Sequence, residues 1–180
     1  MQIAIDADTL KQFFCFVELT PEETREVSGL LGAIDLKSGE VLFRQGDLCT
    51  SVYLIISGKV EIRIEKSGDS SHSLVTLGSG AILGEMGPLT EEPRGATCVA
   101  LGETHLAELP ISALNGGLER GSRWATKFIM ATAKVLAQRL SALNKGTISM
   151  MIQLEKSKSK APVEDELERL RRRLITEWSF

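Results

Sequence analysis

The feature that most constrains the fold is a change of hydrophobic period along the chain. From residue 34 to residue 109, apolar and polar residues alternate, most regularly over residues 60–65. Turn signals built on glycine, such as Gly39, Gly58 and Gly102, separate the alternating stretches. Short alternating stretches with a turn after each predict a β-sandwich or barrel. Helical periods lie on both sides, so we expect an α+β fold that is mainly β.

The N-terminal part, residues 6–32, is predicted to be helical. A row of apolar residues at helical spacing, ending at Val17, predicts a first helix. Thr20 and Glu23 have the spacing of a capping box, which predicts the start of a second helix. Gly32 is expected to end it.

A segment without alternation, residues 83–97, interrupts the predicted strands. Gly84 and Gly95 have no Cβ, so a ligand can approach the main chain there. The guanidinium of Arg94 matches the geometry of phosphate oxygens, and the carboxylate of Glu85 can accept hydrogen bonds from a sugar hydroxyl. Together they suit a ligand with one anionic phosphate and one free ribose hydroxyl.

This segment resembles the phosphate-binding cassette of cyclic nucleotide-binding domains, the family of the catabolite activator protein and of protein kinase A regulatory subunits. The family pattern is Gly-Glu, a spacer, and Arg-small-Ala-Ser/Thr. Its residues and spacing are kept by Gly84-Glu85 and Arg94-Gly95-Ala96-Thr97, and the likeness extends upstream to Gly39-Glu40, Gly46-Asp47 and Gly58-Lys59-Val60. The resemblance implies a double-stranded β-helix (jelly-roll) barrel flanked by N-terminal helices and a long C-terminal helix.

The resemblance also implies the site residues. Arg94 would bind the cyclic phosphate, with the main-chain amides of Gly95 and Ala96 adding donors. Glu85 would accept a hydrogen bond from the ribose 2'-hydroxyl. The ribose would be lined by Gly84, Met86 and Gly87 in addition.

The base pocket implied by the family is apolar. Cyclic-GMP-selective members tend to carry a threonine or serine directly after the arginine, where this chain has Gly95, so cyclic AMP is favoured over cyclic GMP. The wall of the pocket would come from the barrel and from the C-terminal helix: Ile62, Leu74, Leu83, Leu143 and Asn144. The three barrel residues are equally explained as core.

The chain departs from the family at Gly87-Pro88, where members often carry Ala-Leu or Ser-Leu. That pair begins a short helix over the phosphate. Proline is tolerated in the first turn of a helix, so the short helix can still start here. Gly87 makes its entry looser.

A second pattern occupies the C-terminal helix, residues 123–155. Two rows of residues seven apart form a coiled-coil seam: Ile129, Leu136, Leu143 and Met150, with Ala133, Leu140, Thr147 and Leu154. The helix can instead pack on its own barrel, and Trp124 and Phe128 are expected to do so. A seam this long favours a homodimer, and in the family this helix pairs subunits and closes over the base.

The predicted organisation has four parts: N-terminal helices (1–32), the nucleotide-binding barrel (33–122), the long helix (123–155), and a linker with a short charged helix (156–180). After residue 163 acids precede bases, which complements a helix dipole. A basic tail for nucleic acid is the alternative to a solvated, self-paired helix there.

Composition narrows the function. The formal net charge of −3 disfavours nonspecific nucleic-acid binding. Three cysteines far apart in sequence fit a reducing, cytoplasmic location. There is no secretion signal and no apolar run of membrane-spanning length. We therefore expect neither a membrane nor DNA as a direct partner.

The sequence offers no sign of an enzyme. His72 and His105 lack the spacing of metal ligands, which disfavours a cupin metalloenzyme, so neither metal nor cofactor is expected. The scattered cysteines disfavour an iron–sulfur sensor. The sequence also lacks the local signature of a nucleophilic hydrolase, a histidine near a serine or cysteine with a third orienting group.

The function expected is that of a stand-alone sensor of a 3',5'-cyclic nucleotide. Ligand binding would shift the position of the C-terminal helix, which an unknown effector protein would read. Too few residues follow Leu154 for the helix-turn-helix of the family's transcription activators. Two alternatives stay open: a nucleotide-free protein-interaction module of the same fold, or a partner-dependent transcription regulator without its own DNA-binding domain.

Overall fold

The computed structural model describes residues 5–65, 71–90 and 92–157. The chain divides into two compact units, Met1–Ala133 and Lys134–Phe180, and the boundary falls inside the last helix. The charged helix predicted after residue 163 lies outside the described residues.

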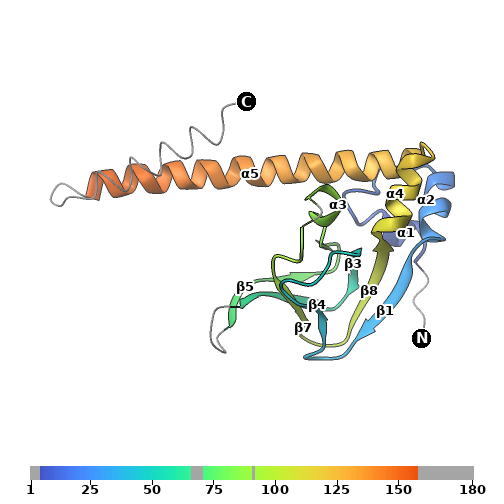
Figure 1. Ribbon diagram of the computed structural model, residues 1–180, viewed down its shortest axis with the longest axis horizontal. Helices are drawn as coiled ribbons and strands as arrows, with labels where there is room; N and C mark the ends of the chain where they lie inside the picture. The colour runs from blue at the N-terminus through green and yellow to red at the C-terminus, as the bar shows by residue number, and fades with distance from the viewer. Residues whose placement is uncertain (1–4, 66–70, 91, 158–180) are drawn as a thin grey trace. The chain divides into compact units, whose positions relative to one another are not determined.

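Within the described residues, eight strands form two antiparallel four-stranded sheets (Figure 1). The order of the first sheet is β1-β8-β3-β6, and that of the second is β2-β7-β4-β5. The strands are β1 (Gly32–Leu36), β2 (Val41–Phe43), β3 (Ser51–Ser57), β4 (Lys59–Glu65), β5 (Ser71–Gly78), β6 (Ile82–Leu83), β7 (Thr97–Ala100) and β8 (Thr104–Pro110). The predicted fold class, mainly β with helices on both sides in sequence, is confirmed.

Strand β3 is continuously apolar from residue 52 to residue 56 because it lies between two cores. Val52 and Leu54 belong to the core that also contains residues of the helices. Tyr53 and Ile55 belong to a second core, together with residues of β4, β7 and β8. Since successive side chains of a strand point to opposite faces, one strand lines both cores.

The tight turn between β3 and β4 explains the glycine that the sequence places there. Gly58 has a φ of 88°, a region that L side chains rarely adopt. A Cβ at Gly58 would lie 2.5 Å from the carbonyl oxygen of Glu103. Both observations require glycine at this position.

The helices are α1 (Ala7–Leu10), α2 (Pro21–Ser28), α3 (Gly87–Thr90), α4 (Ile111–Glu119) and α5 (Arg123–Ser157). The start of α5 is anchored by two aromatic residues, as predicted. Trp124 and Phe128 are fully buried, and the rings of Phe16 and Phe128 lie 5.6 Å apart. Burial of each such side chain contributes about 2–3 kcal/mol.

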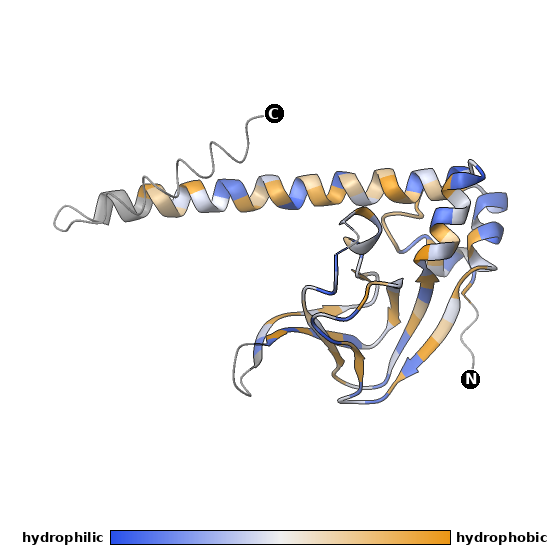
Figure 2. Cartoon of the chain, in the orientation of Figure 1, coloured by the Kyte–Doolittle hydropathy of each residue, from blue (hydrophilic) through white to orange (hydrophobic). Residues whose placement is uncertain are grey.

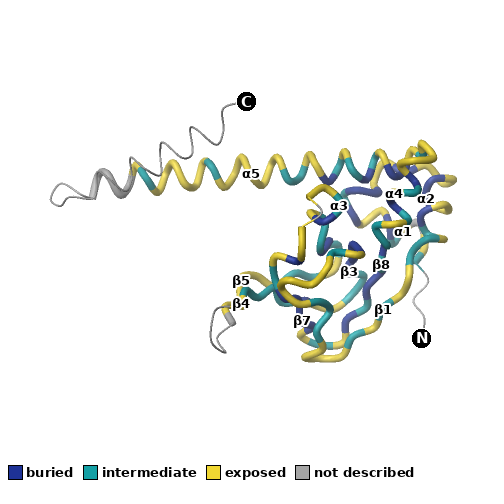
Figure 3. The backbone as a smooth tube through the Cα atoms, in the orientation of Figure 1, coloured by how far each residue is buried: buried dark blue, intermediate teal, exposed yellow. Residues whose placement is uncertain are grey.

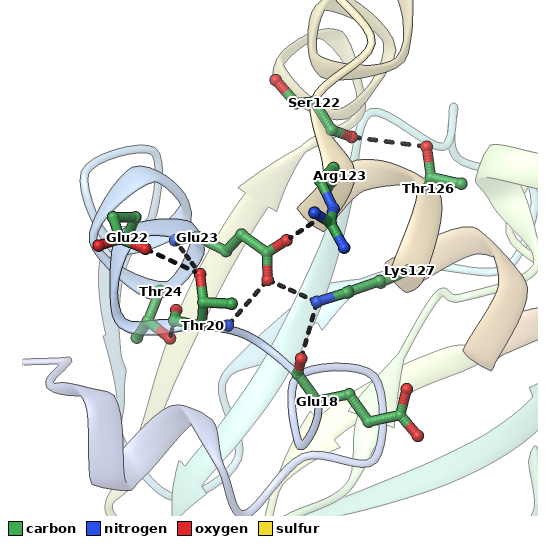
Figure 4. A network of polar contacts seen from close by, with 9 residues as sticks. All are labelled: Glu18, Thr20, Glu22, Glu23, Thr24, Ser122, Arg123, Thr126 and Lys127. Carbon is green, nitrogen blue, oxygen red and sulfur yellow. Dashed lines mark hydrogen bonds and ion pairs between the residues drawn. The ribbon is translucent and has the colours of Figure 1, made fainter.

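A polar cluster around Glu23 joins α2 to the start of α5 (Figure 4). The predicted capping box is confirmed, since the Glu23 amide donates to Thr20 Oγ1 and the Thr20 amide to Glu23 Oε2. The same carboxylate pairs with Lys127 Nζ at 2.6 Å and with Arg123 Nε at 3.6 Å. Lys127 Nζ also donates to the carbonyl oxygen of Glu18 over 2.8 Å.

Parts of the sequence-based prediction are wrong. The helix expected before Thr20 is helical only over Ala7–Leu10, and residues 11–18 form turns. The apolar row there does not stay on one face, because Val17 is 57% exposed. Gly32 does not end a helix; α2 ends at Ser28, and Gly32 begins β1. The core alternative for Leu74 is also wrong, because residues 72–76 of strand β5 are exposed.

The second unit contains the C-terminal part of α5. Apolar and polar residues alternate along its surface (Figure 2), and most of it is exposed (Figure 3). Three residues of the predicted seam are largely exposed there: Leu140 (48%), Leu143 (68%) and Met150 (68%).

Candidate functional site

The segment between β6 and β7 contains the short helix α3 and the arginine that the sequence singled out. The helix runs over Gly87–Thr90 with Pro88 in its first turn, so the proline is compatible with helix formation, as predicted. The main chain at Arg94 is fixed against an earlier loop. The Gly46 amide donates to the Arg94 carbonyl oxygen, and the Arg94 amide donates to the Asp47 carbonyl oxygen, each over 2.8 Å.

The side chain of Arg94 is buried, with 5% of the residue exposed. Its Nη2 donates to the carbonyl oxygen of Ser51 over 2.6 Å. Its Cζ lies 4.1 Å from the ring centre of Phe43 and 5.4 Å from that of Tyr53. The other two nitrogens, Nε and Nη1, are buried and have no hydrogen-bond partner among the described residues. The guanidinium therefore has donors for which the described part of the chain supplies no acceptor.

Gly84 is required by this arginine. Its φ of 76° favours glycine, and a Cβ at Gly84 would lie 2.0 Å from Arg94 Nη1. The family pattern of glycine before glutamate thus has a local cause in this chain. The residue before Glu85 must leave room for the guanidinium.

Gly87, the departure from the family pattern, also has a local cause. A Cβ at Gly87 would lie 1.9 Å from the Sγ of Cys49. That thiol lies 3.9 Å from the carbonyl oxygen of Gly84 and is free. The glycine at the entry to α3 therefore accommodates a cysteine from the loop between β2 and β3.

Arg94 and Glu85 lie within electrostatic reach of the same thiol. Burial raises the pKa of Cys98 to about 12; the positive charge of Arg94 acts to lower it, and the negative charge of Glu85 acts to raise it. Burial also raises the pKa of Tyr53, and the charge of Arg94 again opposes that shift. The two predicted ligand-binding charges are thus brought to one region of the barrel.

Thr97, the last residue of the cassette pattern, has a structural role that the sequence did not reveal. Its hydroxyl accepts from the Gln45 amide over 2.9 Å and donates to Glu65 Oε1 over 2.6 Å. The Glu65 amide in turn donates to Gln45 Oε1 over 2.8 Å. Thr97 therefore ties the loop after β2 to the end of β4.

The other predicted site residues differ in their surroundings. Gly95 is exposed, Ala96 is half-buried and Met86 is 54% exposed. Leu83 is buried in the second core, and Ile62 packs against that core. Leu74 is not a core residue, since it is 53% exposed where β4 and β5 change register. Leu143 and Asn144 belong to the second unit, and their part in the base pocket stays a prediction.

Sequence reasoning missed three residues that contact the Arg94 guanidinium. Ser51 offers a main-chain oxygen, which no side-chain pattern can signal. Phe43 and Tyr53 come from β2 and β3, and their rings are stacked 5.8 Å apart. The only sequence signal for them was an aromatic residue within each strand.

Two other features, a metal site and a membrane-spanning helix, were considered for the described residues. No group of three or more histidine, cysteine or acidic residues could hold a metal ion there. His105 Nδ1 lies 2.6 Å from Asp35 Oδ1, far in sequence from His72 on β5. In that same part of the chain, no helix combines the length and apolar character needed to cross a membrane.

Comparison with known proteins agrees with the cassette. Residues 33–120 match the model of the family described as "Cyclic nucleotide-binding domain". The "Cyclic AMP receptor protein" of Thermus thermophilus is 36% identical over 52% of this chain and 44% of its own length. "Lysophospholipase nte1" of Neurospora crassa is 28% identical over 69% of this chain and 8% of its own length. The chain thus spans less than half of each of these two relatives.

Among solved structures, the N-terminal domain of a transcriptional regulator from Streptomyces coelicolor has a TM-score of 0.66 and 27% identity. The match covers 76% of this chain and 95% of that domain.

Proposed function

Residues 33–120 form a domain of the cyclic nucleotide-binding family, and from this premise we propose that the chain binds a 3',5'-cyclic nucleotide as a regulatory sensor rather than as an enzyme. The receptor of Thermus thermophilus is named for cyclic AMP, which supports the ligand class. The lysophospholipase match covers only 8% of that protein, so its activity is not carried to this chain.

The observation that carries the proposal is the state of Arg94. The side chain is 5% exposed, yet Nε and Nη1 have no partner in the part of the chain that the structure describes. Leaving buried donors of a charged group without acceptors costs a few kcal/mol. The exocyclic oxygens of a cyclic phosphate are anionic acceptors that would remove this cost.

The ribose role belongs to Glu85 in this proposal. Glu85 directly follows Gly84, whose main chain lies close to Arg94 Nη1, and both charges act on the pKa of Cys98. An anionic phosphate and a ribose hydroxyl are separated by only part of one sugar ring. The two side chains suit the two ends of that ring.

Isothermal titration with cyclic AMP, cyclic GMP and 5'-AMP tests the proposal. Arg94→Ala should weaken cyclic nucleotide binding by about 100-fold or more, because it removes a buried charged donor. Arg44→Ala is the matched control, since Arg44 is exposed in the loop after β2. Equal binding by Arg94→Ala and the wild type would remove Arg94 from its role. No heat from the wild type would favour the nucleotide-free interaction module.

We propose cyclic AMP as the preferred ligand, on the absence of a hydroxyl at Gly95. A Cβ at Gly95 would meet nothing within 4 Å, so a larger residue fits there. Gly95→Thr should raise the affinity for cyclic GMP relative to cyclic AMP by up to about 10-fold, the contribution of one hydrogen bond. An unchanged ratio in the same titrations would contradict this assignment.

We also propose that the seam of α5 pairs two copies of the chain. The exposed apolar residues Leu140, Leu143 and Met150 support it, because water-exposed apolar rows favour a partner helix. Light scattering over a concentration series should show a dimer that Leu140→Asp weakens. Gln138→Asp, off the seam, is the control. A concentration-independent monomer would contradict the pairing.

Coupling of the ligand to α5, read by an effector protein, completes the proposal. Hydrogen exchange of α5 with and without cyclic AMP tests it. Unchanged exchange at saturating ligand would contradict the coupling.

A further inference from the structure

We infer that Phe43 is a positioning residue for Arg94: its ring holds the buried guanidinium in its binding orientation without occupying the donors. The inference rests on the proposed function, because the acceptor it prepares for is the phosphate of a cyclic nucleotide.

The guanidinium is held from three directions by groups of unit 1. The ring of Phe43 lies against it, with 4.1 Å between Cζ and the ring centre. Nη2 is fixed by the carbonyl oxygen of Ser51 at 2.6 Å. At Nη1, the main chain of Gly84 approaches so closely that a Cβ would lie 2.0 Å away. These contacts leave the guanidinium little freedom to rotate.

The ring of Phe43 is itself held in place by other residues of the barrel. Its ring stacks on that of Tyr53 at 5.8 Å with an interplanar angle of 27°. It also packs against the second core. We call the ring of Phe43 the platform of Arg94. The platform is part of the barrel, and its position does not depend on a ligand.

An aromatic face suits this site better than a carboxylate would. A buried cation needs a compensating partner, and among the described residues no ion pair joins Arg94 to a carboxylate. A carboxylate would accept hydrogen bonds from the guanidinium and compete with a phosphate. A ring stabilises the cation through its quadrupole and takes up no N–H donor. Nε and Nη1 consequently stay available.

The test compares Phe43→Leu, which removes the ring, with Phe43→Tyr, which keeps it. Phe14→Leu is the control, because Phe14 is also half-buried but packs against the other core. Cyclic AMP titration should show a loss of about 5- to 30-fold for Phe43→Leu, which corresponds to a desolvated cation–π contact. Phe43→Tyr and Phe14→Leu should bind as the wild type does.

A second readout reports on the guanidinium without any ligand. The Nε–Hε signal of Arg94, assigned by its loss in Arg94→Lys, should be shifted by the ring current in the wild type. It should move toward the value of an exposed arginine in Phe43→Leu and stay in Phe43→Tyr.

The outcomes separate the two proposals. If the wild type binds cyclic AMP and Phe43→Leu binds equally well, the platform is overturned and the function stands. Equal losses for Phe43→Tyr and Phe43→Leu also overturn it. If the wild type binds no cyclic nucleotide, the proposed function fails. The Arg94 signal then decides the platform alone, and an unchanged signal in Phe43→Leu rejects it.

Discussion

Two buried charged side chains of this protein, Glu23 and Arg94, differ in how far their hydrogen-bonding groups are satisfied. Glu23 is 8% exposed and Arg94 is 5% exposed. The Glu23 carboxylate accepts from the Thr20 amide and from Lys127, and pairs with Arg123. Among residues 5–65, 71–90 and 92–157, Arg94 has one main-chain acceptor, at Ser51, and two nitrogens without a partner.

The difference teaches which buried charge is structural and which is poised for a ligand. A charge whose hydrogen-bonding capacity is filled by the chain stabilises the fold that provides it. A charge held in place by aromatic packing, with donors left over, stabilises a complex instead. Glu23 therefore serves the attachment of the start of α5 to α2, and Arg94 has the donors that the proposed binding role requires.

The largest effect is expected from Gly84→Ala, which should displace the Arg94 guanidinium and weaken ligand binding. The new Cβ would overlap Nη1 at 2.0 Å, and a φ of 76° strains any L residue. Displacement of the guanidinium should weaken cyclic AMP binding by roughly 100-fold, as measured by titration. Gly102→Ala is the control, because a Cβ there meets nothing within 4 Å. Wild-type affinity in Gly84→Ala would show that the guanidinium is not held where the structure places it.

Glu23→Gln removes the other buried charge, and it should lower the stability of the fold without weakening ligand binding. The amide loses both ion pairs, and we expect the free energy of unfolding to fall by about 2 kcal/mol in denaturant titration. Glu22→Gln is the control, since Glu22 is exposed and lies 3.9 Å from Arg25. It should change stability by about 0.5 kcal/mol or less. Equal effects of the two variants would refute a structural role for Glu23.

The pH dependence of stability gives a second test of the structural role of Glu23. The hydrogen bond from Lys127 and that from the Thr20 amide hold the pKa of Glu23 below its ordinary value of 4.5. The unfolded state therefore binds the proton first, so the contribution of Glu23 is complete above pH 4.5 and is lost as the pH falls through the lowered pKa. The stability difference between wild type and Glu23→Gln should shrink from pH 7 to pH 3. A difference that stays constant would contradict the assignment.

The smallest effect is predicted for the stability of Arg94→Met. This change removes a buried cation with unpaired donors and keeps an apolar side chain over Phe43. The free energy of unfolding should change by less than about 1 kcal/mol, or rise, while binding is lost. A destabilisation as large as that of Glu23→Gln would mean that Arg94 is a structural residue.

Much of the fold was predictable because it depends on local chemistry. The turn at Gly58 and the capping box of Thr20 and Glu23 both follow from neighbouring residues. The prediction of a helix up to Val17 was wrong because apolar spacing alone does not distinguish a helix from consecutive turns. Its apolar spacing was satisfied by turns that bury Leu10 and Phe13 and leave Val17 exposed.

The sequence by itself determined the alternation of strands and turns, the cassette spacing between Glu85 and Arg94, and with them the match of residues 33–120 to cyclic nucleotide-binding domains. Only the tertiary structure decided what surrounds Arg94. Phe43, Ser51 and Gly84 meet it from separate strands and turns, across sheet packing that no local pattern encodes. Whether a buried charge is satisfied depends on these long-range neighbours, so the contrast between Glu23 and Arg94 became visible only in three dimensions.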